Sequence, residues 1–241
     1  MIYSKFVINT LNFLDYFQQK RIIKLINNKF SKPLVVFDIG AHYGETIKLF
    51  YKNLKLEKIY SFEASPINYK ILQKNTLKNN YKKIEIYNYG MGEKISNNYI
   101  NQTVESSSST INKLNINSNY FKKKIKILNI KKKEAFYQKI PIKIITLDHF
   151  IEDKKIECID LLKIDTEGYE FNVLKGLKKY NQKIKLIYFE HHYDDMLLKN
   201  YKFGHIHELL KNYGFKMIKK SKMIFRKSFE YVYENKKNSN F

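Results

Sequence analysis

The segment from residue 34 to residue 45 constrains the fold of this chain more than any other. An apolar run, Leu34 to Phe37, stops at Asp38 and passes directly into Gly40 and Gly44, after which a helical pattern begins. This order is typical of a buried parallel strand, a glycine turn and a helix N-terminus, where α/β sheets bind nucleotide-like cofactors. The segment therefore predicts an α/β protein with a cofactor site at the end of this strand.

The rest of the chain continues the alternation of strands and helices. The predicted strands are 34–39, 58–63, 83–88, 159–164, 184–190, 215–219 and 229–234, and the predicted helices are 44–53, 66–79, 169–179 and 203–213. Such alternation predicts a doubly wound, mostly parallel sheet of seven strands. A short Lys-rich connection joins the last two strands, so we expect the last strand to be antiparallel.

Two segments lie outside this alternation. Apolar residues at helical spacing over 5–29 predict an N-terminal helical extension, residues 1–30, before a main domain over 31–241. Residues 91–140 form an insertion rich in Ser, Asn and Lys, which is compatible with disorder or with a lid that recognises the substrate. Because apolar anchors are interspersed in it, we expect this insertion to be partly ordered.

The charge of the chain bears on its partners. The net charge is +22, but only Arg21 and Arg226 of the 45 basic residues are arginine, the side chain preferred for bidentate contacts to phosphate and guanine. We therefore interpret most lysines as solvated surface residues and do not favour a nucleic-acid partner. No run of about 18 apolar residues predicts a membrane span, and no signal-peptide cleavage site is evident, so we expect a cytoplasmic protein.

The glycine turn favours one kind of cofactor. Its spacing is G-x-x-x-G, and the carboxylates of Asp38 and Glu45 would repel a diphosphate but suit a cationic ligand such as S-adenosylmethionine. Glu63 ends the next strand, where a carboxylate accepts hydrogen bonds from a ribose diol.

At this point the chain resembles a known family. Residues 37–44, 61–66 and 89–92 look like successive motifs of class I S-adenosylmethionine-dependent methyltransferases, which have a Rossmann-like fold. The segments Thr146–Phe150 and Leu161–Glu170 are similar to hallmarks of the FkbM family, whose members are mostly O-methyltransferases acting on sugars or other small molecules. The cofactor residues that the resemblance implies are Asp38, Gly40, Ala41, Gly44, Glu63, Gly90, Met91 and Asp165.

Three residues at the ends of later strands are the predicted catalytic groups. Asp165, Glu190 and His191 are placed to orient an acceptor hydroxyl or take its proton. Together they also offer oxygen and nitrogen donors for a divalent ion, but the sequence does not fix their separation, and we predict no metal.

Two other functions stay open. The basic charge is compatible with an RNA ribose methyltransferase, and the fold alone is compatible with an inactive module that binds the cofactor without chemistry.

Overall fold

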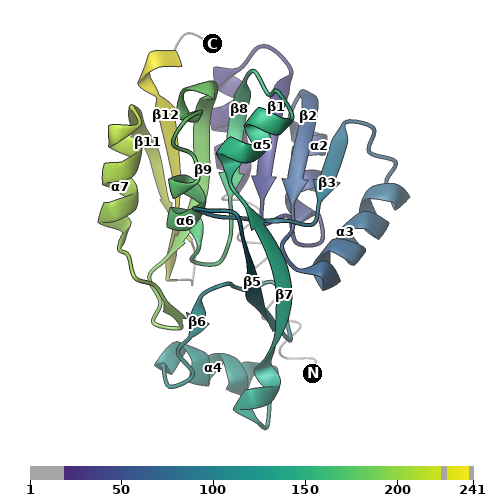
Figure 1. Ribbon diagram of the computed structural model, residues 1–241, viewed down its shortest axis with the longest axis vertical. Coiled ribbons are helices and arrows are strands. Elements are labelled where there is room, and N and C mark those ends of the chain that lie inside the picture. The colour runs from purple at the N-terminus through teal and green to yellow at the C-terminus, as the bar shows by residue number, and fades with distance from the viewer. Residues whose placement is uncertain (1–18, 224–226, 239–241) are drawn as a thin grey trace.

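A seven-stranded sheet forms the centre of the computed structural model, which describes residues 19–223 and 227–238. The strand order is β11-β12-β9-β8-β1-β2-β3 (Figure 1). The strands are β1 (Leu34–Ile39), β2 (Leu56–Phe62), β3 (Ile84–Tyr87), β8 (Ile159–Ile164), β9 (Ile184–His192), β11 (Phe215–Lys222) and β12 (Ser228–Asn235). Strand β12 is antiparallel to both of its neighbours, whereas the pairs among β3, β2, β1, β8 and β9 are parallel. The predicted fold class and its antiparallel last strand are confirmed.

Both faces of the sheet are buried, which explains why its central strands are mostly apolar; the charged residues of β1 and β8 are Asp38, Asp160 and Lys163. Successive residues of a strand point to opposite faces, so Val36 packs into one core, and Phe37 and Ile39 pack into the other. The helix over 19–29 and helix α2 (Glu45–Asn53) cover the first face, through residues such as Ile22 and Phe50. Helices α5 (Leu147–Asp153), α6 (Glu170–Lys175) and α7 (Phe203–Asn212) cover the second.

Helix α3 (Pro66–Lys78) packs its Leu72 against Ala41 and Ile47, beside the glycine turn. Ser65 caps this helix by accepting a hydrogen bond from the Asn68 amide, and Pro66 begins it, as the sequence predicts.

Helix α6 is shorter than the predicted helix 169–179. It ends at Lys175, and the backbone of the following Gly176 lies so close to Gly92 that a Cβ on Gly176 would stand 2.1 Å from the Gly92 carbonyl oxygen. The carboxylate of Asp148 then accepts hydrogen bonds from the backbone amides of residues 178, 179 and 180, which hold the chain in a turn.

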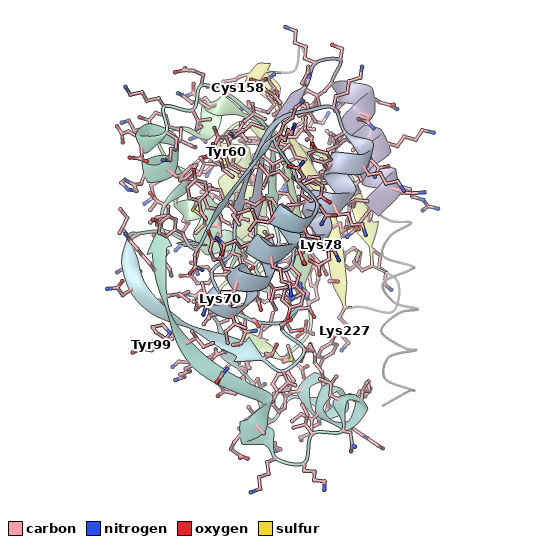
Figure 2. The ribbon with its side chains drawn as sticks, turned by 90° about the vertical axis from the view of Figure 1, so that its right-hand side faces the viewer. Tyr60, Lys70, Lys78, Tyr99, Cys158 and Lys227 are labelled. Atoms are coloured by element: carbon pink, nitrogen blue, oxygen red, sulfur yellow. The ribbon has the colours of Figure 1, made fainter. Side chains whose placement is uncertain are left out.

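The insertion forms regular structure beyond what its composition predicts. Strands β5 (Ser96–Thr103) and β7 (Tyr137–Ile145) pair along their whole length, and β4 (Gly90–Met91) completes a second, three-stranded sheet. The insertion also contains helix α4 (Asn119–Leu128), the 3₁₀ turn η1 (Lys133–Phe136) and strand β6 (Lys113–Leu114). Strand β6 pairs with β10 (Leu197–Leu198). Figures 1 and 2 show this small sheet extending away from the main sheet, with the exposed Tyr99 on its outer surface.

The N-terminal extension is described only from residue 19. Its helical part, 19–29, buries Ile22, Ile23 and Ile26 against the sheet, and residues 1–18 of the predicted extension lie outside the described residues. Among the described helices, none has both the length and the apolar character needed to cross a membrane.

Candidate active site

A cleft of about 820 Å³ lies at the carboxyl ends of β1, β2, β8 and β9. One wall is the glycine turn after β1, and the opposite wall is the insertion. Because parallel sheets place ligands at this edge, the position of the cleft agrees with the position predicted from the sequence. Among the site residues predicted from the sequence, those that line the cleft are Gly40, Ala41, Glu63, Gly90, Met91, Asp165 and Glu190.

The glycine turn is held against the turn that follows β8. Gly40 has a φ of +84°, and a Cβ on it would lie 1.8 Å from the carbonyl oxygen of Asp165. The Asp165 amide donates a hydrogen bond to the Ile39 carbonyl at 2.9 Å. Glycine at position 40 thus satisfies both an unusual backbone angle and a close approach of two chain segments.

Gly44 also has a left-handed φ, of +94°, and forms the N-cap of α2. Gly44 does not line the cleft, so it can affect a ligand only by shaping the turn.

Asp38 does not face the cleft either. It is completely buried, and its nearest cation is the ammonium group of Lys163, with 3.2 Å between Oδ1 and Nζ. Burial raises the pKa of the Asp38 carboxyl, while Lys163 acts in the opposite direction. The resemblance implies that Asp38 acts on the cofactor through the turn or a water, and the structure gives its carboxylate a partner inside the protein, Lys163.

Lys163 is the residue that the sequence reasoning missed. It lies on β8, is itself buried, and its Nζ is also 3.5 Å from Asp165 Oδ2 and 3.4 Å from the Gly40 carbonyl oxygen. Burial lowers its pKa, but the two carboxylates outweigh burial and raise the pKa above its usual range. A lysine inside an apolar strand was the available signal, because an unpaired charge is rarely buried.

Glu63 lies at the cleft end of β2. Its carboxylate accepts hydrogen bonds from the backbone amides of His42, at 2.8 Å, and Ser65, at 2.9 Å. Burial nevertheless raises its pKa to about 7. Each carboxylate oxygen has a second lone pair, so Glu63 keeps acceptor capacity for a ligand in the cleft.

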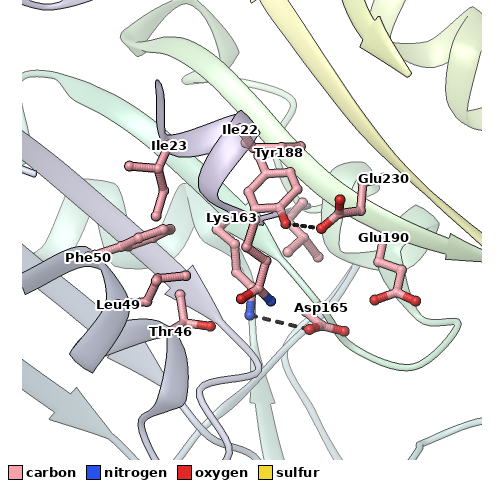
Figure 3. A pocket seen from close by; sticks show the side chains of 12 residues that line it. Ile22, Ile23, Thr46, Leu49, Phe50, Lys163, Asp165, Tyr188, Glu190 and Glu230 are labelled. Atoms are coloured by element: carbon pink, nitrogen blue, oxygen red, sulfur yellow. Dashed lines mark hydrogen bonds and ion pairs between the residues drawn. The ribbon is translucent and has the colours of Figure 1, made fainter. Parts of the chain in front are cut away.

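The other end of the cleft is strongly acidic. Asp165, Glu167 and Glu190 line it, and Figure 3 shows the carboxylates of Asp165 and Glu190 beside each other. Burial raises the pKa of Glu167 to about 7. His192 lies behind this wall, with its Nε2 3.4 Å from Glu167 and 3.7 Å from Glu190. Burial lowers the pKa of His192, but these carboxylates outweigh burial and raise it to about 10.

His191 is not brought to the cleft. Strand β9 continues to His192, so side chains 190 and 192 share one face and His191 points to the other. Its ring is buried against Tyr193 at 4.8 Å and near Tyr201 and Phe203, both at 5.8 Å. Burial, reinforced by the charge of Lys199, lowers its pKa to about 3. The histidine beside the predicted carboxylates is therefore His192.

The insertion contacts both turns that border the cleft. Ser106 Oγ lies 2.7 Å from His42 Nε2 and donates a hydrogen bond to the Tyr43 hydroxyl, whereas Thr110 donates to the Glu167 carbonyl at 2.7 Å. The side chain of Asn112 donates to the Gly168 carbonyl, also at 2.7 Å. These contacts make the insertion a wall of the cleft, with Ile100, Ser106, Ser109, Thr110 and Ile111 lining it.

The residues present fit a cationic nucleoside cofactor. The cleft volume falls in the range of small-molecule sites. A carboxylate with free acceptor capacity, Glu63, stands at one end and the exposed edge of Asp165 at the other. No described lysine or arginine other than Lys48, Lys52 and Lys163 lines the cleft, and Lys163 is neutralised by Asp38 and Asp165.

Comparison with known proteins gives a family match over most of the chain. The family model described as the methyltransferase FkbM domain matches residues 38–217. A structure of the methyltransferase FkbM from Methylobacillus flagellatus KT is similar over 85% of this chain, with 16% identity and a TM-score of 0.53. The present chain spans only 44% of the Methylobacillus chain.

Two further solved structures share the fold. TrmK of M. capricolum, in complex with S-adenosyl-homocysteine, has 12% identity and a TM-score of 0.51, over 89% of this chain and 67% of its own. An rRNA methylase of Streptococcus thermophilus has 10% identity and a TM-score of 0.51, over 89% of this chain and 94% of its own. Comparison with curated proteins gave no match. From the match over residues 38–217, the chain belongs to the FkbM methyltransferase family.

Proposed function

We propose that this protein transfers a methyl group from S-adenosylmethionine to a hydroxyl oxygen of a sugar, glycan or other small molecule. The observation that carries the proposal is that one cleft connects Glu63, at a ribose-binding position, with Asp165 and Glu190 at its other end. Bound S-adenosylmethionine supplies an electrophilic methyl group and a sulfur that keeps the electrons of the broken bond.

In this proposal Glu63 accepts hydrogen bonds from the ribose hydroxyls. Gly90 and Met91 contact the adenine, and Gly40 and Ala41 allow the ligand to approach the backbone of the turn. Asp38 acts indirectly: its ion pair with Lys163 fixes the Gly40 carbonyl and the Asp165 carboxylate in place.

Asp165 and Glu190 act on the acceptor. Asp165 is the more accessible of the two, with 36% of its side chain exposed against 15% for Glu190. Alignment of a hydroxyl by such groups contributes on the order of 7–11 kcal/mol to lowering the barrier, and a positioned base adds about 10²–10⁴-fold. Asp165 takes the proton that the hydroxyl loses.

Ribose methylation of RNA is the second candidate, favoured by the net charge of +22. The cleft itself does not support this candidate, because its inner end presents carboxylates, which repel a phosphate backbone.

We also propose that the protein is cytoplasmic, since its Cys158 is a free cysteine, as is usual for proteins of that compartment.

Isothermal titration of the full chain with S-adenosylmethionine tests the cofactor assignment. We expect saturable binding to the wild type, at least about tenfold weaker binding to Glu63→Ala, and unchanged binding to Glu157→Ala, a control at a side chain that is 88% exposed. The absence of binding to all three proteins would refute the assignment.

A second assay separates the candidate functions. Release of S-adenosylhomocysteine is measured with a panel of sugars and glycolipids and, separately, with RNA. Turnover with a hydroxyl-bearing small molecule supports the proposal. Turnover with RNA alone would favour the ribose methyltransferase, and cofactor binding without any turnover would favour the inactive module.

A further inference from the structure

The acidic end of the cleft contains three side chains arranged as metal ligands. Asp165, Glu190 and His192 each offer a ligand atom, and these atoms all lie within 4.8 Å of one another. Their arrangement follows from the fold: β8 and β9 are adjacent parallel strands whose ends bring Asp165 beside Glu190, and residues 190 and 192 share one face of β9. Figure 3 shows the first two of these side chains side by side.

Two polar atoms of this cluster have no hydrogen-bond partner among the described residues. Glu190 Oε1 and His192 Nε2 are both buried, and the distance of 3.7 Å between them is too long for a hydrogen bond. Both atoms take part in ion pairs, since His192 Nε2 also lies 3.4 Å from Glu167, but a buried polar atom without a hydrogen bond is costly. A cation bound between the two atoms would give both of them a ligand bond.

His192 is also oriented as a metal-binding imidazole. Its Nδ1 lies 3.5 Å from Asp194 Oδ2 on the side away from the cluster, and the other oxygen of Asp194 accepts a hydrogen bond from the Met196 amide at 3.0 Å. In metal sites the second ring nitrogen of a ligand histidine is characteristically held by a carboxylate, which itself is fixed by hydrogen bonds. Asp194 would play that part here.

The charge of the site favours a cation. Asp165, Glu167 and Glu190 converge at this end of the cleft, where the cationic groups near them are Lys163, which is shared with the buried Asp38, and His192. His192 would bind an ion in its neutral form, so the ion would take the place of a proton. Like charges held close together repel one another in a partly desolvated site. A divalent ion would offset this repulsion.

We propose that Asp165, Glu190 and His192 bind one divalent first-row transition-metal ion, of which Mn²⁺ is the type that suits two carboxylates and an imidazole. The inference rests on the proposed function and deepens it, since it replaces the sequence-based expectation of no metal and names a class of acceptor. Three protein ligands leave coordination positions open for oxygen atoms of a substrate. The acceptor would then be a hydroxyl beside a second oxygen, as in a sugar with neighbouring hydroxyls. The ion would lower the pKa of the bound hydroxyl, and the Asp165 oxygen that does not bind the ion would accept the proton, as in the proposed function.

Electron paramagnetic resonance of Mn²⁺ tests the site without any turnover. The full chain is treated with a chelator, dialysed, and titrated with Mn²⁺ while the signal of free Mn²⁺ is followed. We expect one ion per chain for the wild type and a loss of affinity of at least about tenfold for His192→Ala and Glu190→Gln. Asp194→Asn should weaken binding about 10–100-fold, the range for residues that orient a ligand histidine.

Matched controls use the same residue types outside the cleft. His149→Ala and Glu152→Gln change exposed side chains on α5, and both should bind Mn²⁺ like the wild type. Asp165→Asn provides a ligand variant at a partly exposed position, so the test does not depend on variants of buried residues that fail to fold.

Three outcomes decide the matter. One ion per chain that is lost in the ligand variants and kept in the controls supports the site. Binding that the ligand variants do not weaken would overturn it. Failure to bind millimolar Mn²⁺, in a protein that still binds S-adenosylmethionine and still methylates after chelation, would also overturn the metal site and leave the proposed function intact.

Discussion

The buried Lys163 gives the account its sharpest stability prediction. Lys163→Met keeps most of the volume of the side chain but removes the ammonium group that lies 3.2 Å from the fully buried Asp38. Breaking a buried ion pair by removing one partner costs about 3–5 kcal/mol, because the other charge stays buried without compensation. We therefore expect Lys163→Met to lower the free energy of unfolding by this amount.

The other contacts of Lys163 contribute less. Its ion pair with Asp165 is 3.5 Å long and reaches a side chain that is 36% exposed, so its loss costs at most about 1 kcal/mol. The contact with the Gly40 carbonyl, at 3.4 Å, is weaker than an ordinary hydrogen bond of about 1 kcal/mol. Most of the predicted cost therefore comes from Asp38.

A double-mutant cycle checks this assignment. Lys163→Met with Asp38→Asn removes the orphaned charge, so the double variant should be more stable than the sum of the two single effects predicts, by about 2 kcal/mol or more. Urea unfolding followed by circular dichroism measures the four proteins without cofactor. Lys58→Met is the control, because Lys58 pairs with Glu85 at a half-exposed position, and its cost should stay below about 1 kcal/mol. Additive effects, or a Lys163→Met cost as small as that of the control, would refute the reasoning.

Three further predictions concern the cleft. Gly40→Ala should lower the free energy of unfolding, measured with urea, by more than about 3 kcal/mol, because of the positive φ at residue 40 and the clash of a Cβ with Asp165. Gly204→Ala is the control: a Cβ there has nothing within 4 Å, so the change should be neutral or stabilising by up to about 1 kcal/mol. Equal effects of the two substitutions would contradict the close approach at Gly40. Asp165→Asn should lower kcat at least about 100-fold at saturating cofactor with little change in urea stability, and unchanged turnover would exclude a direct role. Because burial raises the pKa of Glu63 to about 7, less of its carboxylate is ionised below pH 7. The affinity for S-adenosylmethionine, measured by calorimetry, should therefore rise about tenfold from pH 6 to pH 8 in the wild type and not in Glu63→Gln. A wild-type affinity that does not change with pH would contradict this role. The same raised pKa means that Glu63 lowers folding stability as the pH rises towards 7.

The sheet was predictable because its strands are buried on both faces. The runs Leu34–Ile39 and Ile159–Ile164 are mostly apolar, with Asp38, Asp160 and Lys163 as their charged residues, and stop at turn residues, so their bounds in the structure equal the predicted ones. The end of the cleft at Gly40 and Glu63 was predictable for the same reason, since both residues directly follow such runs.

The end of the cleft at Asp165 and Glu190 was less predictable because it depends on where one strand ends. The sequence suggests that the strand finishes at Glu190, which leaves His191 and His192 equivalent in a loop. In the structure β9 extends to His192, and the alternation of side chains takes His191 away from the cleft. Only the pairing of β9 with β12, through residues far apart in the sequence, fixes that extension.

The insertion and Lys163 escaped prediction through long-range contacts. Strands β5 and β7 are separated by more than thirty residues. Asn, Gln and Lys, which lack a strong strand preference, occupy several of their paired positions. Lys163 is tolerated inside β8 because Asp38, from another strand, neutralises it. Neither partnership can be read from local sequence.

The central claim is that one cleft holds the cofactor at Glu63 and the reacting hydroxyl at Asp165. A crystal structure of the full chain with S-adenosylhomocysteine tests it most directly. We expect the ribose hydroxyls within hydrogen-bond distance of the Glu63 carboxylate, the adenine beside Gly90 and Met91, and the sulfur facing Asp165 and Glu190. A product molecule bound away from Glu63, or bound with its sulfur turned from Asp165, would contradict the account.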